Sequence, residues 1–182
     1  MEKITVCSLD FIFPKCHPGN RDFYGKVVIK EDITDLLPYI NGYLGNHIEK
    51  PKYCQNINWI KFTFRGFPDV RDTKKQVAIK EKEVKVTIFN DADEAKTYCS
   101  EAIDFLNHII ASKDQITPSY REWNPPKPLD IYNKLKKTNC KECGQPTCMS
   151  FAMKLIQENA NFDDCPYLVE DKKALLEVKK LF

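Results

Sequence analysis

Residues Ile57–Arg65 read INWIKFTFR, and apolar and polar side chains alternate along this stretch. The alternating sets are Ile60, Phe62, Phe64 and Lys61, Thr63, Arg65. A period of two residues puts one set on each face of a β-strand, so the pattern predicts a strand with one buried and one wet face. Three further strands are predicted in the same way: Tyr24–Lys30, Gln76–Lys80 and Val84–Ile88.

Helical spacing appears between and after these strands. Asp91 and Glu94 are spaced as a capping box at the start of a helix that runs to Ser112. Its apolar stripe consists of Ala95, Cys99, Ala102, Ile103, Leu106 and Ile110. A shorter helix is predicted behind Asp32 as its N-cap, with Ile33, Leu36, Leu37 and Ile40 as its apolar residues. Strands combined with separate helices predict a small N-terminal α+β domain over residues 1–117.

A proline-rich segment follows this domain. Residues 118–128 read PSYREWNPPKP and contain four of the chain's eleven prolines. Proline neither continues a helix nor donates to a sheet ladder, so the segment is predicted to be an extended connector. Residues 129–182 then form a short, mostly helical module, with helices expected at Leu129–Lys137, Thr147–Asn159 and Ala174–Phe182.

The composition excludes several classes of protein. The 182 residues are 42% hydrophobic and 30% charged, with 28 Lys and Arg against 26 Asp and Glu. Such a chain is typical of a soluble globular protein, and its net charge of +2 gives no sign of nucleic-acid binding. We expect no membrane span, because no apolar run reaches the length that one needs. The chain start lacks the features of a secretory signal, so we expect a reducing, cytoplasmic location for its eight cysteines.

Four of these cysteines have a spacing that points to chemistry: Cys140-x2-Cys143-x4-Cys148-x16-Cys165. The first three are close enough for one loop to surround a small inorganic core, and Gly144 permits the positive φ that such a loop needs. Cys148 is predicted in the first turn of a helix, where free N–H groups favour an anionic centre. Pro166 is expected to direct the chain away after Cys165. Four thiols without histidine at this spacing are typical of a [4Fe–4S] cluster.

The segment PLDIYNKLKKTNCKECGQPTCMSFAMKLI, with Cys-Pro downstream, resembles the four-cysteine iron–sulfur domain of the corrinoid iron–sulfur protein large subunit. It is also similar to a domain in the B subunit of membrane NADH:ferredoxin redox complexes. The resemblance implies that Cys140, Cys143, Cys148 and Cys165 are the ligands of a [4Fe–4S] cluster. Lys136 departs from the proline common in that family, and its corrinoid-binding signature D-x-H-x-x-G is missing. The whole chain resembles stand-alone iron–sulfur proteins of anaerobic microbes, in which a small α+β domain precedes this module.

Alternatives remain for the cysteines. Structural zinc also takes four thiolates, although zinc sites usually pair two short Cys-x2–4-Cys units, and a disulfide is disfavoured by a reducing compartment. Cys7, Cys16 and Cys54 could form a second metal site with His17, but their spacings match no known pattern. Cys99 lies on an apolar helix stripe and is predicted to be a core residue. The remaining histidines, His47 and His108, are predicted to be ordinary surface residues.

No catalytic motif is present, so the chain is predicted not to be an enzyme but a one-electron carrier. Its predicted partners are a ferredoxin-like donor and, by the resemblance, a low-potential or corrinoid protein as acceptor. The alternative is an accessory or sensor module with a structural cluster or structural zinc, in which the N-terminal domain binds a partner. Four lysines crowd the cysteine loop, either as a docking patch for an acidic donor or as solvated helix-end charges: Lys134, Lys136, Lys137 and Lys141.

Overall fold

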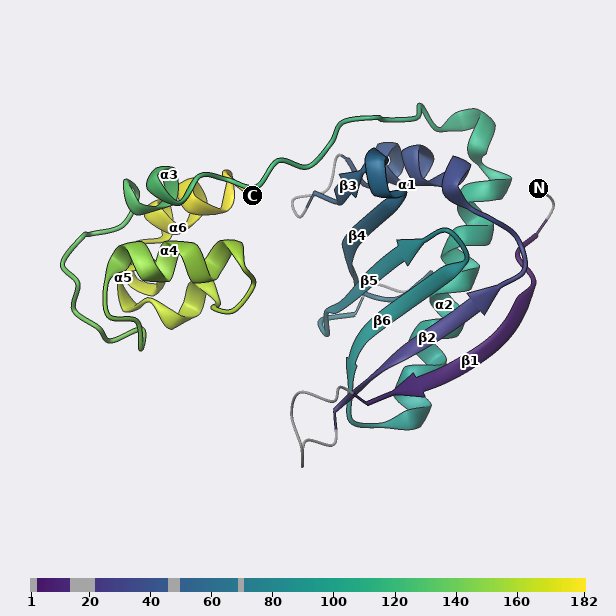
Figure 1. The fold of residues 1–182 in the computed structure, drawn as a ribbon, viewed down its shortest axis with the longest axis horizontal. Helices are drawn as coiled ribbons and strands as arrows, with labels where there is room; N and C mark the ends of the chain where they lie inside the picture. Colours follow the sequence, from purple (N-terminus) through teal and green to yellow (C-terminus); the bar gives the residue numbers. More distant parts are fainter. Residues whose placement is uncertain (1–2, 14–21, 46–49, 69–70) are drawn as a thin grey trace. The chain divides into compact units, whose positions relative to one another are not determined.

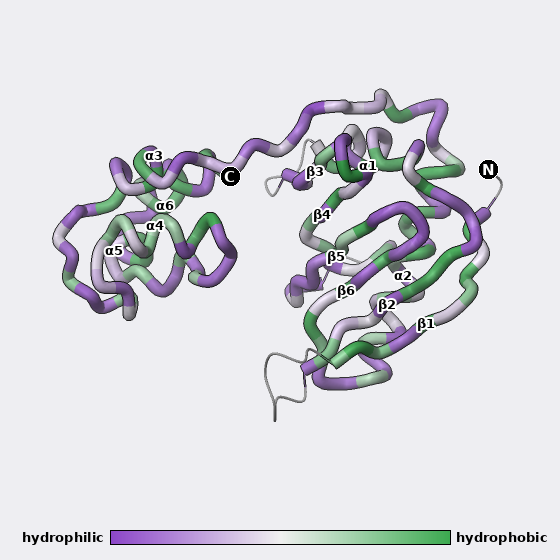
Figure 2. The backbone as a smooth tube through the Cα atoms, viewed as in Figure 1, coloured by the Kyte–Doolittle hydropathy of each residue, from purple (hydrophilic) through white to green (hydrophobic). Residues whose placement is uncertain are grey.

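The computed structural model describes residues 3–13, 22–45, 50–68 and 71–182. The chain divides into two compact units, Met1–Trp123 and Asn124–Phe182. The division falls inside the proline-rich segment, which Figure 2 shows as mostly hydrophilic. Each unit has its own buried core.

The first unit is a six-stranded antiparallel sheet with helices (Figure 1). The strand order is β1-β2-β6-β5-β4-β3, which puts β1 and β3 at the two edges. The strands are β1 (Val6–Ile12), β2 (Phe23–Ile29), β3 (Lys52–Cys54), β4 (Trp59–Phe64), β5 (Lys75–Lys80) and β6 (Glu83–Phe89). The helices are α1 (Leu37–Leu44) and α2 (Ala92–Ala111), with short 3-10 turns η1 (Thr34–Leu36), η2 (Gln55–Ile57) and η3 (Lys113–Gln115). The α+β fold of the first unit is confirmed.

Apolar and polar side chains alternate along the strands, so one face of the sheet is apolar and is covered by a helix. In β4, Ile60, Phe62 and Phe64 are buried, and their neighbours on the other face are partly exposed. Figure 1 shows α2 lying across one face of the sheet, and α2 contributes eight buried residues to the core. The α2 N-cap is confirmed, because the Asp91 side chain accepts a hydrogen bond of 2.7 Å from the Glu94 N–H. The Glu94 carboxylate forms an ion pair with Lys75 at 3.0 Å.

Close packing of helix on sheet occurs at Gly25 in β2. A Cβ atom at this position would lie 2.4 Å from the Cys99 sulfur, which is closer than any side chain allows. The prediction that Cys99 is a core residue is confirmed, since it is 1% exposed. Burial raises the pKa of its thiol to about 12, so this cysteine stays protonated and unreactive at neutral pH.

The structure corrects two predictions for the first unit. Strands β1 and β3 have no counterpart among the predicted strands, because β1 is a largely exposed edge strand and β3 has only three residues. The helix after Asp32 begins later than predicted: Asp32 accepts a hydrogen bond of 2.9 Å from the Thr34 N–H, a short 3-10 turn follows, and α1 starts at Leu37. Pro38 is tolerated because it lies in the first turn of α1, where its missing N–H has no partner to lose.

Residues 117–123 are attached to the first unit by hydrogen bonds. Asn41 is buried in α1, and its side-chain amide donates to the carbonyls of Ser119 at 2.8 Å and Arg121 at 3.0 Å. The Trp123 N–H donates to the Tyr53 carbonyl at 2.9 Å. Gly42 lets the segment come close, because a Cβ atom there would lie 2.1 Å from the Thr117 carbonyl oxygen. We call residues 117–123 the strap.

The second unit is a set of short helices around a small core. They are α3 (Pro128–Tyr132), α4 (Cys148–Ile156), the 3-10 turn η4 (Phe162–Asp164), α5 (Pro166–Glu170) and α6 (Lys172–Lys179). Its fully buried side chains include Ile131, Phe151 and Leu168. The mostly helical character predicted for this part of the chain is confirmed. Within the described ranges, no helix is both long and apolar enough to cross a membrane.

Several helix boundaries in the second unit differ from the predicted ones, among them the end of the terminal helix, which lies at Lys179 instead of Phe182. The first helix ends at Tyr132 instead of Lys137, which has a positive φ of 61° that no right-handed helix accommodates. The helix from Cys148 ends at Ile156, and Glu158 follows with a φ of 58°. The terminal helix starts earlier than predicted because Asp171 caps it, accepting from the Lys173 and Ala174 N–H groups.

Gly42→Ala tests how the strap is attached. The added methyl group collides with the Thr117 carbonyl, so we expect the strap to detach and trypsin to cut after Arg121 several-fold faster than in wild type. Overpacking costs about 1–3 kcal/mol, more than the gain of about 1 kcal/mol from replacing glycine within a helix. Ser100→Ala, at an exposed position of α2, is the control and should leave the cleavage rate unchanged. Equal cleavage rates in Gly42→Ala and wild type would contradict the proposed contact.

Candidate iron–sulfur site

Cys148 is the first residue of α4, as the sequence predicts. Thr147 is the N-cap, and its hydroxyl accepts a hydrogen bond of 3.0 Å from the Ser150 N–H. The Cys148 N–H donates to the side-chain oxygen of Asn139 at 2.9 Å. Cys148 is therefore held from the helix side by the cap and from the loop side by Asn139.

The loop before α4 turns sharply without regular secondary structure. Lys137, Asn139, Lys141 and Gly144 all have positive φ, between 51° and 73°. The Gly144 N–H donates to the Lys141 carbonyl at 2.9 Å and closes the tight turn between Cys140 and Cys148. A Cβ atom on Gly144 would meet no atom within 4 Å. Glycine is therefore favoured here by the positive φ of the backbone and not by close packing against a neighbour.

Cys165 is delivered by a separate turn. The Asn161 N–H donates to the Asp164 carboxylate at 2.7 Å in a capping box that closes η4. Pro166 is the first residue of α5, so the chain continues from Cys165 as a helix. The Cys165 carbonyl accepts from the N–H groups of Leu168 at 2.9 Å and Val169 at 3.2 Å, which fixes Cys165 at the beginning of that helix.

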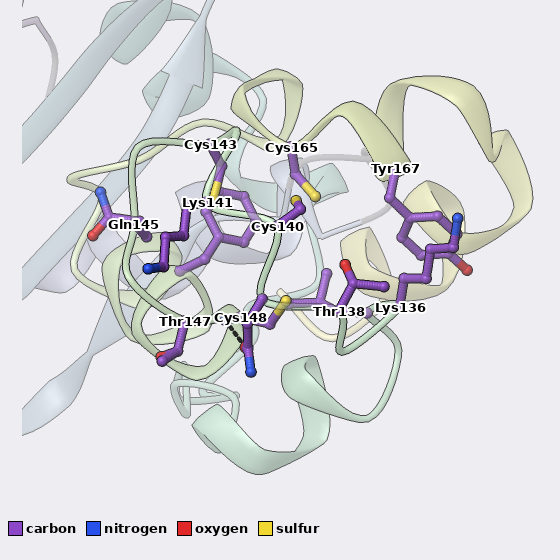
Figure 3. A pocket seen from close by; sticks show the side chains of 13 residues that line it. Lys136, Thr138, Cys140, Lys141, Cys143, Gln145, Thr147, Cys148, Cys165 and Tyr167 are labelled. Atoms are coloured by element: carbon purple, nitrogen blue, oxygen red, sulfur yellow. Dashed lines mark hydrogen bonds between the residues drawn. The ribbon is translucent and has the colours of Figure 1, made fainter.

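These elements bring four cysteines to one pocket (Figure 3). Its lining includes Cys140, Cys143, Cys148 and Cys165. Buried side chains of Leu135 and Phe151 form part of the wall, and the cavity volume is about 20 Å³. Cys140 is exposed, whereas the other three cysteines are half-buried and pack against the core of the second unit.

The thiols in this pocket influence one another. The pKa of Cys165 is raised, mainly by burial and further by its neighbours Cys143 and Cys148, against backbone hydrogen bonds that lower it. All the cysteines in the described ranges are free thiols. Those ranges contain no group of three His, Cys, Asp or Glu side chains placed to hold a single metal ion.

The candidates for a second site do not come together. Cys7 lies on β1 and Cys54 on β3, at opposite edges of the sheet. Cys16, His17 and His47 lie outside the described residues. His108 is an exposed residue of α2 whose ring contacts the rings of Tyr43 and Phe67.

The four lysines near the loop fall into two pairs. Lys134 forms an ion pair with Glu177 at 3.3 Å. Lys137 donates to the Asn133 side chain at 2.9 Å and lies over the ring of Tyr132. Lys136 and Lys141 instead line the cysteine pocket, and Figure 3 shows Lys141 beside Cys143 and Lys136 next to Tyr167.

Asn139 is the residue that the sequence reasoning missed. It lies within the Thr-Asn-Cys motif, but its role depends on a hydrogen bond to a residue nine positions later. The only signal in the sequence is its type, because asparagine tolerates positive φ and offers a side-chain acceptor.

Comparison with known proteins gives the class of this segment. Residues 135–167 match the family model "Putative Fe-S cluster". The segment is thus similar to an iron–sulfur family. A stretch of 54 residues in the C-terminal region is 50% identical to acetyl-CoA decarbonylase/synthase complex subunit gamma 1 of Methanosarcina thermophila, covering 30% of this chain and 12% of that protein. A stretch of 49 residues is 47% identical to the corrinoid/iron-sulfur protein large subunit of Moorella thermoacetica, covering 27% of this chain and 11% of that protein.

The resemblance found in the sequence is thus confirmed for the C-terminal region. The chain spans only about an eighth of the length of these relatives. No solved structure matches the chain.

Proposed function

We propose that the second unit binds one [4Fe–4S] cluster through Cys140, Cys143, Cys148 and Cys165 and serves as a one-electron carrier. The observation that carries the proposal is the meeting of these four cysteines at one pocket, although Cys165 is remote from the others in sequence. The match of residues 135–167 to an iron–sulfur family supports the type of cofactor.

The chemistry of the donor set fits such a group. All four donors are thiols, which as thiolates are the usual ligands of iron–sulfur clusters. When bound, a cluster of this kind accepts and returns one electron. The chain's own residues hold the ligands: Asn139 fixes Cys148, and Leu135 and Phe151 keep water from the inner wall. The N-terminus of α4 favours the negative charge that four thiolates bring.

A carrier, and not an enzyme, is the better proposal for this chain. Four cysteines can supply one thiolate to each of four irons, which leaves no open position for a substrate. The names of the relatives place them in the acetyl-CoA decarbonylase/synthase complex and among corrinoid/iron-sulfur proteins. We therefore propose a ferredoxin-like donor and a corrinoid or other low-potential protein as acceptor. The cytoplasmic location stays a prediction.

The second candidate is an accessory or sensor module in which the cluster, or a zinc ion, has a structural role. The small core of the second unit favours it, because a unit of this size gains much of its stability from a bound metal centre. Reversible reduction at accessible potentials distinguishes the carrier, whereas a cofactor that holds the fold and does not cycle supports the accessory role.

Cys165→Ser tests the ligand set. Wild-type protein purified without oxygen should contain about four irons and four sulfides per chain and a band near 400 nm that dithionite bleaches. Cys165→Ser should lose or convert the cluster, as measured by iron content and EPR spectrum. Cys7→Ser and Cys99→Ser should keep the wild-type spectrum, because neither cysteine lines the pocket. A colourless wild-type protein with one zinc per chain would refute the proposal.

Removal of the cofactor should unfold the second unit alone. Its core consists of eight buried apolar residues, few for an independent domain. After treatment with chelator and air, we expect residues 129–182 to lose their amide protection in hydrogen exchange while the sheet of the first unit keeps it. Proteolysis should then begin between Asn124 and Lys127. Protection of both units in the apo-protein would show that the core suffices.

Lys136 and Lys141 should increase the rate at which an acidic electron donor associates with the second unit. Changing both to Glu should slow reduction by a ferredoxin several-fold at low salt, because the two lysines line the pocket. The effect should shrink as the Debye length falls from about 10 Å at 0.1 M to about 3 Å at 1 M. Lys172 and Lys173, which are exposed on α6 and outside the pocket lining, give a control with the same change in charge. Equal rates for both double variants would leave the lysines as ordinary surface charges.

A further inference from the structure

The first unit contains a pocket that plays no part in the iron–sulfur site. It has a volume of about 350 Å³ and lies among η1, the start of α1, η2, η3 and the strap. This volume is within the range of small-molecule sites in proteins. All of its lining residues belong to the first unit.

Tyr53 lines this pocket with a phenol group. The residue is 3% exposed and lines the pocket, and its hydroxyl makes no hydrogen bond in the described part of the chain. Among the described residues the one fully buried side-chain polar atom without a partner is Trp123 Nε1, so the Tyr53 hydroxyl is not fully enclosed and is open to water or a ligand in the pocket. Burial, together with the nearby Tyr120 and Glu122, raises the pKa of Tyr53, which keeps the phenol protonated and able to donate.

Two opposite charges line the same pocket without pairing with each other. The Lys113 ammonium lies 4.6 Å from the centre of the Tyr39 ring, and this contact holds it at the pocket wall. Asp35 contributes the carboxylate, and no ion pair joins it to Lys113 in the described residues. Neutral hydrogen-bonding groups complete the lining, among them the side chains of Asn58 and Tyr120.

We propose that this pocket binds a small zwitterion of the amino-acid type, with its carboxylate toward Lys113, its ammonium toward Asp35 and its polar atoms toward the Tyr53 hydroxyl. A ligand with both charges satisfies both side chains. A phosphate-bearing ligand would meet only one lysine and would face Asp35, whereas a neutral sugar would leave both charges unmatched. The aromatic rings of Tyr39, Tyr53 and Tyr120 suit the apolar body of such a molecule.

The strap completes this site. Tyr120 lies between Ser119 and Arg121, whose carbonyls accept the hydrogen bonds from buried Asn41. The contact between α1 and the strap therefore positions one wall of the pocket. The inference stands independently of the cofactor, because every group that it uses lies before Asn124.

Calorimetry on the full chain tests the proposal with a panel of common L-amino acids and ω-amino acids. At least one should bind with one-to-one stoichiometry. The carboxamide and the N-acetyl derivative of that compound should each bind at least about tenfold more weakly, since each lacks one charge. Failure of every amino acid to bind overturns the proposal, as does equal affinity for the derivatives. Binding of glucose or inorganic phosphate in place of the amino acids overturns it as well.

Matched variants locate the binding site. Lys113→Met should weaken the amino acid at least about tenfold and remove the preference over its carboxamide, while Lys80→Met should change neither. Tyr53→Phe should weaken binding about fivefold through the lost hydrogen bond, and Tyr43→Phe, outside the pocket lining, should not. Thermal melting checks that each variant folds. Unchanged affinity in both folded pocket variants would place the ligand elsewhere and overturn the assignment.

Discussion

The cysteine loop has to keep its shape without the hydrogen-bond ladder of a helix or strand. Between α3 and α4 the backbone reverses direction through four residues with positive φ, and only a few local hydrogen bonds support it. The bond from the Cys148 N–H to Asn139 ties the two ends of this loop together. The positions of Cys140 and Cys143 relative to Cys148 depend on this tie, and so does the part of the pocket that the loop forms.

In the first unit too, an asparagine side chain forms hydrogen bonds with backbone groups outside regular elements. Apart from tyrosines, Asn41 is the one buried polar or charged residue among those that the structure describes, and it donates to two carbonyls of the strap. In both units an asparagine amide satisfies backbone groups that no regular element pairs. The Asn41 bonds are partly buried, and because an unsatisfied buried polar group is costly, they define the local conformation sharply, whereas the Asn139 bond is exposed. Each asparagine lies beside a pocket, and the chain next to it supplies part of the lining.

The two pockets are lined by side chains of different chemical types. The C-terminal pocket gathers thiols on an apolar wall, which suits an inorganic centre bound through sulfur. The N-terminal pocket gathers phenols, amides and one charge of each sign, which suits a polar organic molecule. Cys99 belongs to neither site. Its burial against Gly25 shows that a cysteine in this chain can be purely a packing residue.

The sequence by itself determined the elements whose signal is local. Period-two alternation located β2, β4, β5 and β6, the Asp91 cap located the start of α2, and the Thr-Asn-Cys motif identified the iron–sulfur segment. Only the tertiary structure decided the rest, because it depends on contacts between residues remote in the chain. Edge strand β1 forms by pairing with β2, and the strap is held by Asn41, some eighty residues before it. The Tyr53 pocket exists only where separate turns meet, so no spacing in the sequence could reveal it.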